Sequence, residues 1–244
     1  MPDRLVVVEH EDNATLDLMA APLADSWTGP IEVLRPYRGD VLPQDTSGIG
    51  ALLVLGGEMG ALDDVAAPWL PGTRRLLAQA VAGQVPTLGI CLGAQLLAAA
   101  TGGVVERGSG GLELGLVSLR PLPWAGADPY LGHVLGRLGG QLGDVLQYHR
   151  DAVTTLPPDA ELLVSGEQYP HQAFRVGAAA WGVQYHPEVS ATAFESWLGA
   201  AEVEDPPASA AARAAIHARP GVAGRPDLAR AHATGLVAAI TLVP

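Results

Sequence analysis

Cys91 is the chain's only cysteine, and it lies in a Gly-Ile-Cys-Leu-Gly pattern over residues 89–93. An apolar run over 86–90 precedes it and a helical pattern over 91–101 follows. Small residues on both sides of a side chain allow a sharp strand-to-helix turn that exposes it. The helix N-terminus would favour a thiolate, and the Leu92 N–H would point outward toward a developing oxyanion. We predict a nucleophilic Cys91; the competing interpretation is a buried structural cysteine.

A thiolate that attacks an amide needs a base and a group that orients the base. Two His-x-acid patterns supply candidates: His149-Arg150-Asp151 and His186-Pro187-Glu188. In an extended segment, residues two positions apart lie on the same side, so either acid would lie near its own histidine. Pro187 restricts the backbone beside His186. This favours His186 only slightly, and the spacing alone leaves both histidines open.

The composition excludes several other chemistries. All 14 basic residues are arginine, so no lysine is present for a Walker phosphate loop, a Schiff base or pyridoxal phosphate. One cysteine rules out intrachain disulfides and Cys-rich zinc or iron–sulfur sites. A net charge of −12 argues against nucleic-acid binding. We therefore expect no cofactor, no metal and no membrane span, and a cytoplasmic location because the N-terminus lacks a signal-peptide layout.

The elements that must position these residues alternate in the first hundred positions. Short apolar runs predict strands over 4–8, 31–34, 51–55 and 86–90, and helical patterns occur over 15–23, 69–81 and 91–101. This alternation indicates a mostly parallel sheet covered on both faces by helices. Short runs after residue 103, separated by Gly, Pro and Asp, predict an antiparallel extension of that sheet.

Residues 201–244 are rich in Ala, Arg and Pro. Pro206 and Pro226 mark the starts of two helices. The second helix would carry Leu228, Leu236 and Ile240 at multiples of four. We expect one domain over 1–200 and a C-terminal helical extension over 201–244 packed on the same domain; a mobile tail is the alternative.

Three segments resemble the signature blocks of class I glutamine amidotransferases: 55–60 (LGGEMG), 89–98 (GICLGAQLLA) and 182–188 (GVQYHPE). They follow the family's order and its approximate spacing. The segments at 149–151 and 172–175 are similar to the glutaminase half of GMP synthetases. The resemblance implies an α/β fold of the flavodoxin-like type, a three-layer sandwich whose mostly parallel central sheet has an antiparallel extension and carries Cys91 at a nucleophile elbow.

The resemblance also implies residue roles. Cys91 would be the nucleophile, His186 the general base and then acid, and Glu188 the group that holds the imidazole. The N–H groups of Gly57 and Leu92 would form the oxyanion hole. Gln95 lies one helical turn after Cys91 and would contact the substrate.

Glu58 departs from the family pattern, in which Pro or Ser is frequent at this position. A carboxylate there could repel an oxyanion or bind a substrate ammonium group, and the simplest interpretation is a solvated loop acid.

The resemblance implies hydrolysis of the glutamine side-chain amide through a γ-glutamyl thioester. We expect the ammonia to reach a separate synthetase subunit, because the 44 residues after residue 200 are too few for an ATP-using domain. Such a subunit would have low activity alone. Two alternatives remain: a γ-glutamyl peptide or amide hydrolase of the same fold, and a non-catalytic member that binds a ligand or protein.

Overall fold

A central sheet organises the protein, for which a computed structural model describes residues 3–219 and 221–242. Its strands are β1 (Arg4–Val8), β2 (Ile31–Leu34), β3 (Ile49–Val54), β4 (Thr87–Ile90), β7 (Arg120–Pro121), β10 (Ala160–Ser165), β11 (Ala173–Val176) and β12 (Ala180–Val183). They lie in the order β2-β1-β3-β4-β12-β11-β10-β7. The strands from β2 to β12 are parallel, and β11, β10 and β7 continue the sheet in antiparallel pairs.

Two small antiparallel ribbons flank this sheet. In one, β5 (Val104–Arg107) pairs with β9 (Asp151–Thr155); in the other, β6 (Glu113–Ser118) pairs with β8 (Asp144–His149). Only Arg150 separates β8 from β9, so the chain passes from one ribbon to the other at this residue. This crossing places His149 at the end of one ribbon and Asp151 at the start of the other.

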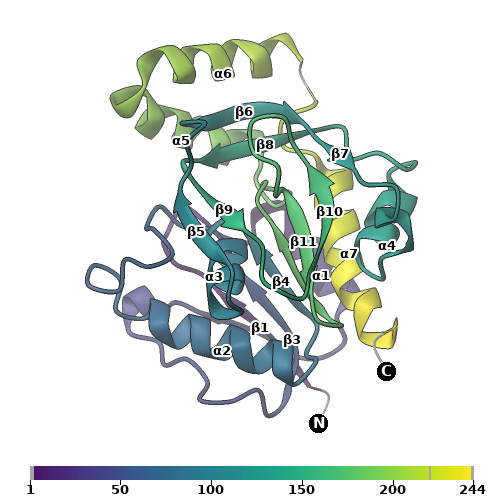
Figure 1. Cartoon of the computed structure of the whole chain (residues 1–244). Coiled ribbons are helices and arrows are strands. Elements are labelled where there is room, and N and C mark those ends of the chain that lie inside the picture. The colour runs from purple at the N-terminus through teal and green to yellow at the C-terminus, as the bar shows by residue number, and fades with distance from the viewer. Residues whose placement is uncertain (1–2, 220, 243–244) are drawn as a thin grey trace.

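Helices cover both faces of the sheet (Figure 1). Their bounds are α1 (Ala20–Ser26), α2 (Leu70–Ala82), α3 (Leu92–Ala100), α4 (Leu131–Arg137), α5 (Ala191–Glu204), α6 (Pro206–Ala218) and α7 (Pro226–Leu242). The helices α2 and α3 share one apolar cluster with the sheet, and α1, α4 and α7 share another. The expected three-layer α/β sandwich with an antiparallel extension is confirmed.

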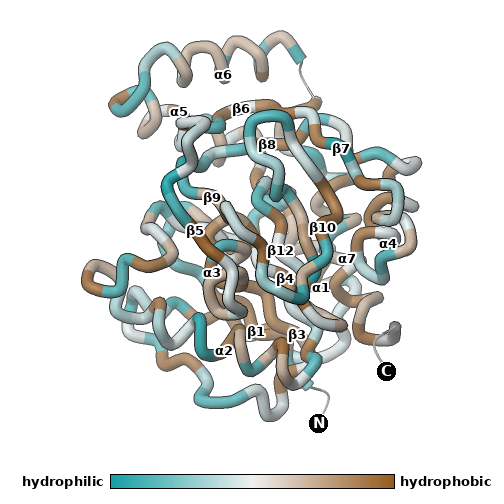
Figure 2. Tube along the Cα trace, in the orientation of Figure 1, coloured by the Kyte–Doolittle hydropathy of each residue, from teal (hydrophilic) through white to brown (hydrophobic). Residues whose placement is uncertain are grey.

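Strand alternation explains why the core has two halves. Along β1, Leu5 and Val7 belong to the cluster beneath α7, whereas Val6 and Val8 belong to the cluster beneath α2 and α3. Successive residues of a strand point to opposite faces, and helices cover both faces here, so all four side chains are fully buried. The tube in Figure 2 is correspondingly hydrophobic along β1 and β3.

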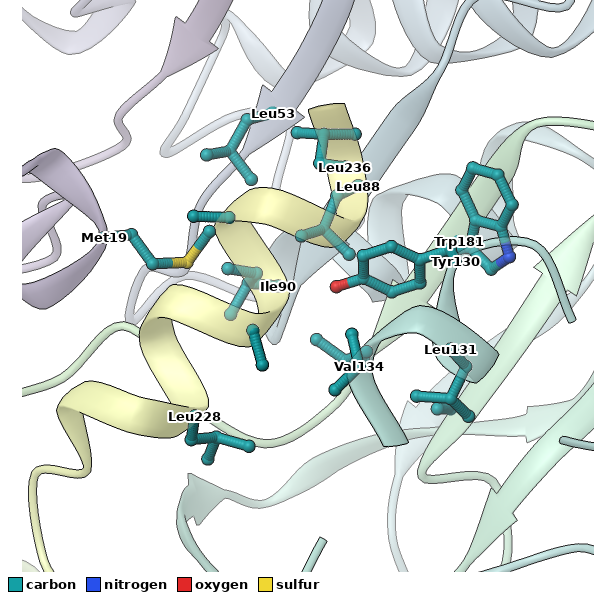
Figure 3. Close-up of a cluster of buried hydrophobic side chains, with 14 of the residues drawn as sticks. Met19, Leu53, Leu88, Ile90, Tyr130, Leu131, Val134, Trp181, Leu228 and Leu236 are labelled. Carbon is teal, nitrogen blue, oxygen red and sulfur yellow. The ribbon is translucent and has the colours of Figure 1, made fainter. Parts of the chain in front are cut away.

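The last helix is part of the core. Helix α7 lies across the sheet with Leu228 and Leu236 directed into the cluster that also holds Trp181 (Figure 3). His232 of the same helix is buried between the hydroxyls of Tyr130 and Tyr185. The predicted helix starts at Pro206 and Pro226 are confirmed. Helix α5 crosses residue 200, where the sequence suggested a boundary.

Some elements differ from the expectation. The helical pattern over 15–23 resolves into a 3₁₀ turn, η1 (Asp17–Met19), followed by α1. Helix α4 was not expected, because its Gly132 and Gly136 lower helix propensity; packing against α7 stabilises it. Within the described residues, none of the helices is both long and apolar enough to cross a membrane.

Candidate active site

Cys91 occupies the turn between β4 and α3. Its backbone has φ 50° and ψ −107°, a region that favours glycine and costs about 1–3 kcal/mol for other residues. The Cys91 N–H donates to the Val183 carbonyl at 2.8 Å and so ties the turn to β12. A Cβ at Gly93 would lie 2.0 Å from the Val54 carbonyl oxygen, so only glycine permits this close approach. The strand–turn–helix geometry predicted around Cys91 is present.

His186 and Glu188 form a buried pair beside Cys91. The imidazole Nδ1 lies 2.8 Å from Glu188 Oε1, and the two side chains are 3% and 1% exposed. Burial lowers the pKa of His186, but the Glu188 carboxylate and the Cys91 sulfur outweigh it and raise the pKa to about 10. The raised pKa favours a protonated imidazole at His186.

Neighbouring elements fix this pair. The His186 N–H donates to the Leu146 carbonyl at 2.9 Å, and the Glu188 carbonyl accepts from the Leu18 N–H at 2.9 Å. The Trp197 ring of α5 packs against the imidazole edge-to-face, with ring centroids 4.8 Å apart. Trp197 was missed in the sequence because nothing in the pattern around 191–204 singled out an aromatic contact with His186.

One pocket of about 550 Å³ is lined by Gly57, Cys91, Gln95, His149 and His186, whereas the predicted site residues Glu188 and Leu92 are buried and are not part of its wall. Carboxylates also contribute to the wall: Glu11, Glu58, Asp63, Asp151 and Glu204. Two arginines, Arg107 and Arg150, are interspersed, and Arg150 is paired with Glu204 at 3.2 Å. The pocket wall is therefore acidic on balance. A second hollow of about 750 Å³, over residues 118–143, contains none of the predicted site residues.

The loop that carries Gly57 packs against Leu92, the residue after Cys91. A Cβ built on Gly57 would lie 3.0 Å from Leu92 Cδ2 and 2.7 Å from Met59 Sδ, so these residues are in contact. Within residues 3–219 and 221–242, no protein group accepts a hydrogen bond from the Gly57 or Leu92 N–H. Gly57 lies on the pocket wall, whereas Leu92 is fully buried. A Cβ on Gly56 would lie 3.2 Å from His186 Cε1, which places this loop directly against the imidazole.

Glu58 follows these donors and is exposed. Its N–H donates to Glu11 Oε2 at 3.2 Å. Burial raises the pKa of Glu11, and the Glu58 N–H partly opposes that shift. The Glu58 carboxylate lies on the pocket wall, where solvent also reaches it.

Gln95 is 4% exposed and is held by two acceptors. Its Nε2 donates to the Asp151 main-chain carbonyl at 2.9 Å and to Gln184 Oε1 at 3.1 Å. Gln184 in turn donates from Nε2 to Cys91 Sγ at 3.4 Å. No role was predicted for Gln184, although alternation along an extended segment places it on the same side as His186.

The interpretation of the His149 pair needs a correction. His149 Nδ1 lies 2.9 Å from the Asp151 main-chain oxygen, and Nε2 lies 2.8 Å from Glu113 Oε2. The Asp151 carboxylate is not the partner, because the chain turns at Arg150 and two-residue alternation does not continue from β8 into β9. Glu113 was not predicted. It is 2% exposed, and the only signal in the sequence is that this acid stands next to the apolar residues of β6.

Comparison with known proteins decides the family. The family model for glutamine amidotransferase class-I matches residues 43–201. The chain belongs to the class I glutamine amidotransferase family. The resemblance of its three motifs is thereby confirmed. Among the described residues, no cluster of three or more His, Cys, Asp and Glu side chains could hold a metal ion.

Individual relatives agree with this assignment. A GMP synthase [glutamine-hydrolyzing] from Porphyromonas gingivalis is 32% identical over 190 residues, which cover 78% of this chain and 34% of the relative. One from Thermus thermophilus is 34% identical over 177 residues, covering 72% and 30%. The chain therefore spans about a third of the length of these relatives.

Solved structures share the whole fold. A glutamine amidotransferase from Thermotoga maritima has a TM-score of 0.77 at 26% identity, covering 97% of this chain and 99% of the other. One from Methylobacillus flagellatus has a TM-score of 0.71 at 27% identity, covering 100% and 93%. The fold of these proteins extends beyond the matched family segment to almost all of this chain.

Proposed function

We propose that this amidotransferase hydrolyses the glutamine side-chain amide through Cys91, His186 and Glu188 and supplies the ammonia to a separate acceptor enzyme. One observation carries the proposal: the strained Cys91 lies beside the buried His186–Glu188 pair, and Cys91 and His186 line the same pocket as Gly57, whose N–H meets no protein acceptor among the described residues. A nucleophile, a base with its orienting acid, and oxyanion donors are the parts that acyl transfer requires.

In the first step, the Cys91 thiolate attacks the γ-carboxamide carbon. The carbonyl electron pair moves to oxygen, where the N–H groups of Gly57 and Leu92 stabilise the negative charge. The His186 imidazolium then gives its proton to the nitrogen as the C–N bond breaks. Ammonia leaves, and the γ-glutamyl group remains on sulfur as a thioester.

In the second step, water attacks the thioester carbon while neutral His186 takes its proton. The tetrahedral intermediate uses the same two N–H donors. When it collapses, the C–S bond breaks, the thiolate is restored beside an imidazolium, and glutamate leaves. Glu188 keeps Nδ1 protonated throughout and so presents Nε2 for both proton transfers.

Gln95 would bind the substrate amide. Its NH₂ group is occupied by Asp151 and Gln184, which leaves its carboxamide oxygen as the atom that can accept from the substrate. This use of Gln95 predicts recognition of a primary amide, which has hydrogen atoms to donate.

The acceptor enzyme is proposed from the relatives, which are named GMP synthases. A subunit that serves a synthetase gains from low activity alone, because idle hydrolysis wastes glutamine. The oxyanion loop is the proposed point of control: a Gly57 donor turned away would cost on the order of 10²–10³ in rate. Glu58 and Met59 would then sense the docked surface.

The acidic pocket wall favours a second candidate, a γ-glutamyl hydrolase whose leaving amine is cationic. Net negative charge around a cleft raises the local concentration of cations. Such an enzyme has no acceptor to wait for and should be fully active alone.

The test is a substrate panel on the purified chain, comparing glutamine, γ-glutamyl dipeptides and γ-glutamyl diamines, with ammonia and glutamate as readouts. Glutamine hydrolysis that rises when the acceptor enzyme is added supports the first proposal. Rapid cleavage of γ-glutamyl amines with little glutamine use supports the second. Inactivity on every γ-glutamyl compound, with and without the acceptor, would reject both in favour of a non-catalytic binding member.

A further inference from the structure

A continuous path of hydrogen bonds connects Cys91 to the second buried His–Glu pair. From the sulfur it passes to Gln184 at 3.4 Å and on to Gln95 at 3.1 Å. The Asp151 main-chain oxygen follows at 2.9 Å, and it also accepts from His149, again at 2.9 Å. Every side chain on this path is nine-tenths or more buried.

The direction of each bond follows from the carbonyl in the middle of the path. The Asp151 main-chain oxygen only accepts, so the Gln95 group that meets it is the NH₂ group. The same NH₂ group meets Gln184, and therefore the Gln184 atom facing it is the carbonyl oxygen. The Gln184 NH₂ group is left to face Cys91 Sγ. The network thus aims a donor at the sulfur.

The His149–Glu113 pair holds the far end of the path in place. His149 Nδ1 must carry a proton, because it meets the same carbonyl oxygen. Nε2 lies 2.8 Å from Glu113 Oε2, which also accepts from Gln172 Nε2 at 2.8 Å. The Gln172 main-chain oxygen accepts from the Gln184 N–H at 2.9 Å. The main chain of Gln184 is therefore held by Gln172, and its side chain is held by Gln95.

We propose that Gln184 stabilises the Cys91 thiolate by hydrogen bonding, and that His149 and Glu113 are positioning residues that keep this donor aimed at the sulfur through Asp151 and Gln95. The inference rests on the proposed role of Cys91 as nucleophile. It gives the second histidine a function other than that of a base.

The chemistry explains why a neutral donor on the sulfur is useful. In the proposed mechanism the sulfur attacks as a thiolate and is a thiolate again as the thioester breaks, whereas it is neutral in the thioester itself. A donor strengthens as the acceptor gains charge. Gln184 therefore stabilises the departing thiolate in the transition state of deacylation more than it stabilises the thioester.

The test measures how the rate of Cys91 alkylation by iodoacetamide depends on pH. Because the chain has one cysteine, alkylation reports Cys91 alone. In Gln184→Met, which keeps the size but loses the donor, the pH midpoint should rise by roughly 1–2 units. Gln184→Glu, which replaces the donor by an acceptor, should raise it as well and serves if the first variant does not fold.

The control is Gln79→Met. Gln79 lies on α2, its Oε1 is buried, and among the described residues its side chain makes no hydrogen bond to Gln184, Gln95 or Cys91. Its variant should keep the wild-type midpoint. An unchanged midpoint in folded Gln184→Met or Gln184→Glu, or an equal rise in the control, would overturn the assignment.

A double-variant cycle tests the positioning role. His149→Phe should raise the midpoint in the same direction but less than Gln184→Met, and it should add nothing in the Gln184→Met background. Additive shifts would show that His149 acts independently and would refute the path. Alkylation needs no glutamine, so this result is separate from the proposed function, which the substrate panel alone can reject.

Discussion

Replacing Glu188 by Gln removes one charge from the centre of the site and keeps its shape. Glu188 Oε1 lies 2.8 Å from His186 Nδ1, and the second oxygen is buried without a partner among the described residues. The substitution therefore leaves an imidazole that is still buried but has lost the carboxylate that raises its pKa.

The size of the effect follows from Coulomb's law. With charge centres about 4 Å apart and an effective dielectric constant of about 20, the attraction is about 4 kcal/mol. That corresponds to a pKa change of about 3 units. The pKa of His186, raised to about 10 in the native protein, should therefore fall to about 7.

The assay is the pH dependence of kcat for the preferred substrate. Acylation needs the imidazolium to protonate the leaving nitrogen, so activity is lost as pH rises through the pKa of His186. The alkaline limb should move from about pH 10 in the native protein to about pH 7 in the variant.

Asp128→Asn is the control, since it removes a carboxylate of equal burial that pairs with Arg175 and not with a histidine. Its alkaline limb should stay at the native position. A Glu188→Gln enzyme with the native limb, or an equal shift in the control, would refute the reasoning.

Three further predictions concern other features. Gly56→Ala should lower kcat about tenfold or more, because the new Cβ would lie 3.2 Å from His186 Cε1 and displace the ring. The melting temperature should change little, so steady-state kinetics and thermal melts together test this. Cys91→Gly should unfold with about 1 kcal/mol more free energy than Cys91→Ala, the reverse of the usual order, because φ is 50° there. His232→Gln should weaken the loss of stability in acid, which denaturant titrations at several pH values measure.

The sign for His232 follows from its burial, which lowers its pKa from 6.5 to about 3. Below pH 6.5 the unfolded chain binds a proton that the folded protein excludes until about pH 3, so stability falls as pH falls through this window. The slope is on the order of 1 kcal/mol per pH unit. An unchanged slope in His232→Gln would show that the buried imidazole does not cause the acid sensitivity. Native kcat in Gly56→Ala would contradict the predicted displacement of His186, and a Cys91→Gly variant less stable than Cys91→Ala would contradict the predicted backbone strain.

Local sequence patterns predicted the elements that carry short, self-contained signals. Cys91 lies between two glycines next to an apolar strand, and His186 and Glu188 are two positions apart, so each pattern is complete within a few residues. The parallel order of the first strands followed from their alternation with helices.

What the sequence could not predict depends on contacts between distant segments. Glu113 reaches His149 only because β6 pairs with β8, and that register comes from the tertiary fold. The turn at Arg150, which separates His149 from the Asp151 carboxylate, has no strong turn residue to mark it. Trp197 contacts His186 only once α5 has packed beside the pocket.

The central claim is that Cys91 forms a covalent γ-glutamyl intermediate. The most direct measurement is acid quenching of the enzyme during turnover of glutamine, followed by peptide mass spectrometry of the fragment that contains Cys91. We expect a γ-glutamyl group on Cys91 in the native enzyme, and neither the adduct nor ammonia release in a folded Cys91→Ala variant. Ammonia release by that variant, or a γ-glutamyl group on another residue, would show that Cys91 is not the nucleophile.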